Sequence, residues 1–222
     1  MGFFRQHSKE QPYSDISASD LKSIYDGLTY IFGKYGVVII GGRAVNIYCF
    51  NNKRDTHDID VVVSENPTKI DNLYEKAAEN GFFVKKDGSD IKFIDKTTGA
   101  QIDFFYKEEV GGIKTQDILD SAMKRPLTKN GTVRVIDPAL LILIKYSAGR
   151  DKDWQDIANL IRNLYNNSPE EFIKEERDKI GRYLDSEQIE RFAVELGHTI
   201  DHYNQLLEEQ RKQLYAAARR KI

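Results

Sequence analysis

Apolar residues in the first part of the chain recur every three or four positions, which is the spacing of one face of a helix. This pattern runs from Ser17 to Phe32 and predicts an amphipathic helix with Ser17 or Ser19 as its N-cap and Gly33 or Gly36 as its stop. The apolar positions are Leu21, Ile24, Tyr25, Leu28 and Ile31.

After this helix, short apolar runs alternate with helical segments. The runs predict strands at Val37–Ile40, Asp58–Val63, Phe82–Lys85, Ile91–Asp95, Gln101–Tyr106 and Thr132–Ile136. The segments between them predict helices at Arg43–Phe50, Lys69–Asn80 and Thr115–Lys124. We therefore expect an α+β fold in which a mixed β-sheet is flanked by helices.

From residue 138 to the end, the pattern predicts helices alone. Asp137 and Pro138 make a good helix start, because Asp caps the free backbone N–H groups and Pro suits the first helical position. We expect a core domain at residues 1–137, with residues 1–14 as a mobile leader, and a helical domain at residues 138–222.

The last helix has a heptad-like stripe, which allows two interpretations. It packs on the preceding helices, or it forms the interface of a homodimer or with a partner protein. The stripe consists of Ile189, Ala193, Leu196, Ile200, Tyr203, Leu207 and Leu214.

Composition narrows the class of protein. A hydrophobic content of 40% in 222 residues allows a real core, and a net charge of -2 gives no overall attraction to nucleic acid or anionic lipid. The basic end from Arg211 to Lys221 is either a solvated tail or a local contact for RNA phosphates. The single cysteine, Cys49, fits a reducing cytosol, and the longest apolar run, Ala139–Ile144, is far short of a membrane span. We expect a cytoplasmic protein with no membrane contact.

Carboxylates in two of the expected strands are candidate metal ligands. Asp58 and Asp60 lie two residues apart, so their side chains share one face of a strand, where they repel each other unless a cation lies between them. Asp103 joins them if its strand lies beside theirs. Three such groups suit Mg²⁺ or Mn²⁺ and can hold two ions about 3.5–4 Å apart. The alternative is a set of solvated strand ends, although Asp is disfavoured inside strands.

A phosphate-binding turn is expected next to these carboxylates. Gly41 and Gly42 end a buried strand and open a helix, whose N-terminal N–H groups attract an anion. Arg43, Lys53 and Arg54 supply cations nearby, although each also fits a solvated surface charge. Thr56 either binds phosphate or caps the strand, while His57 faces away from Asp58.

Together these residues resemble the nucleotidyltransferase superfamily typified by DNA polymerase beta. Small prokaryotic members, including those of toxin–antitoxin and abortive-infection systems, often have a GG-x-A turn similar to Gly41–Ala44 and an Arg-x-[Ser/Thr]-x-Asp-Ile-Asp segment similar to Arg54–Asp60. The resemblance covers about residues 17 to 160 and implies a nucleotidyltransferase core followed by a helical domain. It departs from the usual pattern in having Gly-Gly where Gly-Ser is common.

The resemblance implies transfer of NMP from an NTP to a hydroxyl acceptor, with release of pyrophosphate. Asp58, Asp60 and Asp103 would be the catalytic residues and the ligands of Mg²⁺ or Mn²⁺. The NTP would be bound by Gly41, Gly42, Arg43, Arg54, Thr56 and Lys145.

Lys145 lies in an apolar helix, so it must reach solvent or meet an anion. The resemblance assigns it to the triphosphate, and a solvated lysine is the alternative. We expect Asp153 and Asp156 to anchor the helical domain through Arg150 or Lys152 rather than to bind metal.

The acceptor stays open among RNA, protein and a small molecule. A second hypothesis is a non-catalytic nucleotide-binding or partner-binding module of the same fold, for example a component of a toxin–antitoxin pair. The three intact aspartates argue against that hypothesis.

Overall fold

The computed structural model describes residues 16–49, 55–56, 58–88, 90–129 and 131–219. Seven of its strands form one mixed sheet in the order β3-β4-β5-β2-β1-β9-β8, and β6 and β7 form a separate hairpin. The strands are β1 Val37–Ile39, β2 Asp58–Val63, β3 Phe82–Asp87, β4 Asp90–Asp95, β5 Gln101–Phe105, β6 Glu109–Val110, β7 Ile113–Lys114, β8 Met123–Thr128 and β9 Gly131–Val135.

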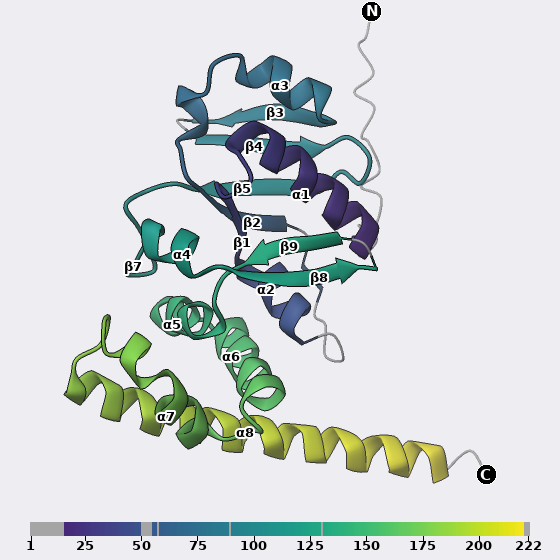
Figure 1. The fold of residues 1–222 in the computed structure, drawn as a ribbon. Helices are drawn as coiled ribbons and strands as arrows, with labels where there is room; N and C mark the ends of the chain where they lie inside the picture. The colour runs from purple at the N-terminus through teal and green to yellow at the C-terminus, as the bar shows by residue number, and fades with distance from the viewer. Residues whose placement is uncertain (1–15, 50–54, 57, 89, 130, 220–222) are drawn as a thin grey trace, which may run out of the picture.

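Helices flank this sheet, which confirms the expected α+β fold (Figure 1). In Figure 1, α1 crosses the sheet, α3 lies beside β3, and α5 to α8 gather beyond β8. The helices are α1 Ala18–Phe32, α2 Gly41–Tyr48, α3 Leu73–Glu79, α4 Thr115–Ser121, α5 Pro138–Ala148, α6 Asp151–Leu164, α7 Pro169–Ile180 and α8 Ser186–Arg219, with a 3₁₀ turn, η1, at Pro67–Lys69.

Strand β2 lies inside the sheet. It pairs in parallel with β5 on one side and antiparallel with β1 on the other. Its side chains alternate, so that Ile59, Val61 and Val63 are buried in the core. The side chains of Asp58 and Asp60, which alternate with these residues, therefore point from the opposite face of the sheet. The strand is the fixed element on which the candidate site is built.

Two predicted helix starts are confirmed by their caps. The Ser17 side chain accepts a hydrogen bond from the backbone N–H of Asp20 at the start of α1, and Gly33 ends that helix with a positive φ of 82°. The Asp137 side chain accepts a hydrogen bond from the backbone N–H of Ala139 at the start of α5. This second cap fixes where the helical part of the chain begins.

Part of the stripe on α8 packs against earlier helices, which is the first of the two interpretations given above. Leu196 and Ile200 are buried, Ile189 and Tyr203 pack partly against the core, and α8 contacts α6 and α7. The side chain of Leu214 lies outside the described residues. No helix in the described part of the chain is long and apolar enough to cross a membrane.

Two expectations about local structure are wrong, and one small element has no counterpart in the sequence analysis. The helix expected at Thr115–Lys124 ends at Ser121, and strand β8 follows, with Pro126 in this edge strand. The helix expected from Lys69 begins only at Leu73, because Asn72 has a left-handed backbone with a φ of 54°. The hairpin of β6 and β7 was not expected, since its strands have two residues each. Phe50 and residues 1–14 lie outside the described residues.

Candidate active site

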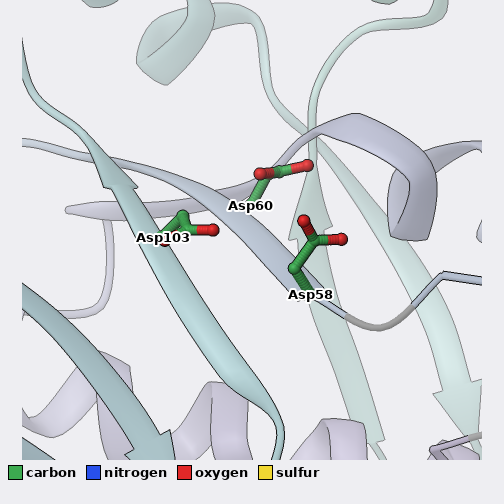
Figure 2. Close-up of side chains that lie close together, drawn as sticks. All are labelled: Asp58, Asp60 and Asp103. Carbon is green, nitrogen blue, oxygen red and sulfur yellow. The ribbon is translucent and has the colours of Figure 1, made fainter.

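Three aspartates from two neighbouring strands meet at one point (Figure 2). Asp60 on β2 and Asp103 on β5 are register partners, so their side chains leave the same face of the sheet. Asp58 lies two residues before Asp60 and shares that face. One carboxylate oxygen from each residue lies within 4.8 Å of the others. The convergence expected from the strand pattern is therefore present.

The carboxyl group of Asp60 has a raised pKa. Burial raises its pKa, and the negative charges of Asp58 and Asp103 raise it further, to about 6. The cations Lys145 and Lys152 act in the opposite direction but do not cancel this effect. In the absence of a bound cation, the cluster is thus under electrostatic strain near neutral pH.

Asp103 is held by two side chains of its own sheet. The Gln101 amide donates hydrogen bonds to both carboxylate oxygens, each at 3.1 Å. The Lys92 Nζ on β4 lies 3.3 Å from Oδ1, and Lys92 and Asp103 are register partners. Sequence reasoning missed Lys92 and Gln101. Knowing that β4 pairs with β5 would have pointed to Lys92.

The double glycine brings the N-terminus of α2 close to Asp60. Gly41 has a positive φ of 63°, and a Cβ atom at this position would lie 2.0 Å from Asp60 Oδ2. Only glycine fits both the backbone conformation and the close approach. The partial positive charge of the helix N-terminus therefore faces the carboxylate cluster. Gly42 follows in the same turn and is buried.

Thr56 and Arg43 contact the protein itself. The Thr56 hydroxyl donates a hydrogen bond of 3.2 Å to Asp58 Oδ1 and is buried. The Arg43 guanidinium is also buried and donates a hydrogen bond of 2.5 Å to the backbone carbonyl of Thr56. The interpretation of Arg43 as a solvated surface charge is therefore wrong. Arg54, Lys53 and His57 lie outside the described residues.

Lys145 lies in a buried ionic cluster between α5 and α6. Its Nζ atom is 2.6 Å from Asp156 Oδ2 and 3.2 Å from Asp153 Oδ1. The alternative of a solvated lysine is wrong, because the side chain is only 5% exposed. Burial alone would raise the pKa of Asp153, but hydrogen bonds from Arg150 and Lys145 lower it overall. The expected pairing of Asp153 with Arg150 is present, at 2.5 Å.

A cleft of about 610 Å³ connects these parts. Its lining includes Asp58 and Asp60, the Gly41-Gly42 turn and residues of the α5–α6 junction. Three cations of that junction, Lys145, Arg150 and Lys152, line the cleft. The arrangement offers carboxylate oxygens for a cation and N–H donors for an anion within one cavity.

Solved structures with a similar chain path include three nucleotidyltransferase-like proteins. They are a lincosamide antibiotic adenylyltransferase, LnuA, bound to lincomycin (17% identity, TM-score 0.42, 61% of this chain and 94% of that chain), an antigenic nucleotidyltransferase-like protein from Paracoccidioides brasiliensis (22%, 0.47, 67% and 78%) and the antibiotic-resistance factor ANT(2'')-Ia (13%, 0.44, 88% and 99%). These likenesses are too distant to assign a substrate.

No curated protein sequence matches the chain. The family model described as "Nucleotidyl transferase of unknown function (DUF2204)" matches residues 22–209, which is most of the sequence. The chain therefore belongs to this family of nucleotidyl transferases.

Proposed function

We propose that the chain uses Mg²⁺ or Mn²⁺ to transfer NMP from an NTP to a hydroxyl group, with release of pyrophosphate. The observation that carries this proposal is the convergence of Asp58, Asp60 and Asp103 at the border of a cleft lined by cations. Carboxylates and N–H donors in one cleft match the two needs of phosphoryl chemistry, a cation site and a polyphosphate site.

The three aspartates fit a hard divalent cation. Their donor atoms are all oxygens, and they lie close enough together to share one ion. The raised pKa of Asp60 reflects a repulsion that a bound cation would remove. When bound, such an ion neutralises phosphate charge and lowers the barrier to attack at phosphorus.

Other parts of the cleft lining suit the triphosphate. Gly41 and Gly42 line the cleft, and the first backbone N–H groups of a helix have no partner within the helix, so those at the start of α2 could bind an anion. Lys145 forms ion pairs with Asp153 and Asp156 and also lines the cleft. With Arg150 and Lys152, it would bind the phosphates. Arg54 is a further predicted contact.

Thr56 and Arg43 would support the reaction without touching the nucleotide. Thr56 holds one oxygen of Asp58, and Arg43 holds the backbone of Thr56. A fixed carboxylate loses less conformational freedom on binding a cation. Asp103, at the border of the cluster, would accept the proton of the attacking hydroxyl or orient that hydroxyl toward the α-phosphorus.

Pyrophosphate release tests this function. The wild-type protein, each NTP and Mg²⁺ or Mn²⁺ are combined with a cell extract as a source of acceptor, and release is compared for Asp60→Asn and for Asp178→Asn. Asp178 is an exposed aspartate on α7, so its variant controls for the substitution itself. We expect release with wild type and Asp178→Asn and none with Asp60→Asn. Normal release by Asp60→Asn would refute the assignment of the carboxylates.

Pyrophosphate release, combined with a measurement of thermal stability, separates the enzyme from the alternative of a non-catalytic module. Metal-dependent stabilisation of the wild type by an NTP, without pyrophosphate release, would support a binding module. Membership in the toxin–antitoxin subtype, a cytoplasmic location, a homodimer or partner at the C-terminal helix and a domain boundary near Asp137 stay predictions from the sequence.

A further inference from the structure

A row of four charged residues crosses the sheet and ends in the carboxylate cluster. Lys85 on β3 pairs with Lys92 on β4, Lys92 pairs with Asp103 on β5, and Asp103 pairs with Asp60 on β2. Residues that pair directly across strands point to the same face. Two cations and two carboxylates therefore lie side by side in a line, on the face that carries the candidate active site.

This face is open over β3 and β4, whereas the opposite face is buried. Phe82, Ile91 and Phe93 point to the buried face, which α1 and α3 cover (Figure 1). On the open face, Lys85 is exposed, Lys92 and Ile94 are half-buried, and Phe83 is 61% exposed. We call the surface formed by Phe83, Lys85, Lys92 and Ile94 the open platform.

The positive charges on the open platform favour the binding of an anion. Lys85 and Lys92 stand directly opposite each other, an arrangement of like charges that destabilises a sheet unless an anion lies near them. Lys92 is paired with Asp103, and in the described part of the chain no ion pair of Lys85 is found. Lys85 is thus positioned to bind a negative group from solvent.

The platform also offers an aromatic surface. Phe83 pairs with Ile94 in the row next to the lysines, and the Lys96 ammonium lies 5.1 Å from the centre of its ring. An exposed aromatic ring beside cations on an open sheet is the arrangement with which proteins stack bases and bind the backbone of single-stranded nucleic acids.

A hollow of about 450 Å³ links the platform to the aspartates. Its wall includes Lys92, Asp103, Phe105, Lys107 and the hairpin residues Val110 and Gly111. Three of these residues, Phe105, Val110 and Gly111, also line the cleft of the candidate active site. The acidic residues Asp90 and Glu109 line the hollow as well. The volume suits one small group, such as a terminal nucleoside.

We propose that the open platform binds the end of a single-stranded RNA, with its phosphates along Lys85 and Lys92 and its terminal hydroxyl in the hollow beside Asp103. RNA is the occupant we choose because the exposed ring of Phe83 shares a face of β3 with the exposed Lys85, and proteins bind single-stranded RNA ends by stacking unpaired bases on aromatic rings. The proposal rests on the proposed function and names its acceptor. The hydroxyl oxygen forms a bond to the α-phosphorus of the NTP, the bond from that phosphorus to the bridging oxygen breaks, and pyrophosphate leaves. The hydroxyl proton passes to Asp103.

Neighbouring lysines on β3 provide a matched test. Lys85 and Lys86 are both exposed, but they point to opposite faces, and Lys86 lines a hollow on the side of α3. The probe is a 5′-labelled oligoribonucleotide of about 15 nucleotides, a length close to the site sizes of single-strand binders. Its affinity is measured by fluorescence anisotropy at several salt concentrations, with EDTA and without NTP.

We expect Lys85→Glu to lower the affinity about tenfold and to reduce the salt dependence by about one ion, while Lys86→Glu changes neither. Phe83→Ala should lower the affinity about fivefold, because it removes a stacking surface. Tyr74→Ala, at an aromatic residue of α3 that is 53% exposed, should have no effect. Equal effects of Lys85→Glu and Lys86→Glu, or no binding by the wild type, would overturn the proposal.

A second measurement separates this proposal from the proposed function. With metal and NTP present, an RNA with a free 3′ hydroxyl should gain a nucleotide, and an RNA blocked by a 3′ phosphate should not. Consumption of NTP without extension of RNA, or preferential labelling of protein or of a small molecule, would leave the enzyme intact and refute the RNA acceptor. RNA binding in EDTA without any pyrophosphate release would instead refute the proposed function.

Discussion

The Nζ atom of Lys145 lies 2.6 Å from Oδ2 of Asp156, and both side chains are buried although they belong to different helices. Asp153 adds a second carboxylate at 3.2 Å and links the lysine to Arg150. This cluster joins α5 to α6 at the wall of the cleft. One set of ion pairs therefore connects helix packing with the position of two cations at the candidate active site.

Removing the Lys145 ammonium should lower the stability of the protein. Lys145→Met leaves two buried carboxylates without their shared ammonium, so the free energy of unfolding should fall by about 3 kcal/mol in urea titrations. The double variant Lys145→Met/Asp156→Leu should recover most of this loss, since it removes a buried charge of each sign. As a control, Lys22→Met breaks the exposed pair with Asp26 and should cost less than about 1 kcal/mol. A loss of that small size for Lys145→Met would contradict the buried cluster.

Asp60 should destabilise the metal-free fold above about pH 6. Its pKa is about 6 in the folded protein and 3.8 in the reference state, so the folded form binds the proton more tightly. The charged group therefore lowers stability above pH 6, and this penalty disappears as the pH falls toward 4. In EDTA, Asp60→Asn should raise the free energy of unfolding by about 1–3 kcal/mol at pH 7.5 and hardly at all below pH 4. Thermal unfolding at both pH values measures this, and equal effects at the two would contradict the electrostatic strain.

Gly41→Ala should damage both the fold and the site. The new Cβ would have to occupy a point 2.0 Å from Asp60 Oδ2, and alanine is strained at the φ of 63°. We expect lower thermal stability and loss of Mg²⁺-dependent pyrophosphate release. Gly33→Ala is the matched control, because Gly33 has a φ of 82° and no neighbour within 4 Å of the point that a Cβ atom would occupy. That variant should lose about 1–3 kcal/mol of stability through strain and keep its activity.

Thr56 should act through Asp58. Thr56→Val keeps the shape of the side chain but removes the hydrogen bond of 3.2 Å to Asp58 Oδ1, so the affinity for Mn²⁺ should fall about tenfold. Thr56→Ser keeps the hydroxyl and should restore most of the affinity. Isothermal titration of Mn²⁺ gives both values. If the Val and Ser variants bind Mn²⁺ equally, the hydroxyl does not position Asp58.

The alternation of apolar and polar residues, together with the capping and turn residues, predicted the elements that form the candidate site. The alternation in Asp58–Val63 and Gln101–Tyr106 placed three aspartates on common faces, and the adjacency of β2 and β5 brought them together. Caps at Ser17 and Asp137 predicted two helix starts correctly. The alternation and the caps depend on local backbone geometry, which neighbouring residues determine, whereas the adjacency of β2 and β5 was a hypothesis that the structure confirms.

Other features, which depend on residues far away in the sequence, could not be predicted from the sequence alone. Strand β8 contains Pro126 and has no buried position, so it lacks the alternation of a half-buried strand, and only its pairing with β9 defines it. The burial of Arg43 depends on the carbonyl of Thr56, and the setting of Lys145 depends on two aspartates of α6. The same holds for Lys92, which is placed beside Asp103 by the pairing of β4 with β5.

The central position of β2 has a consequence for hydrogen exchange. Ladders to β1 and β5 hold Val61 and Val62 on both sides, so the amides of this part of the strand should exchange only when the sheet itself opens. The hairpin of β6 and β7, which lines the cleft through Val110 and Gly111, has only two residues in each strand and should open far more often. Asp60 thus lies directly before the doubly paired residues of β2, while the wall that faces incoming molecules can adapt to their shape.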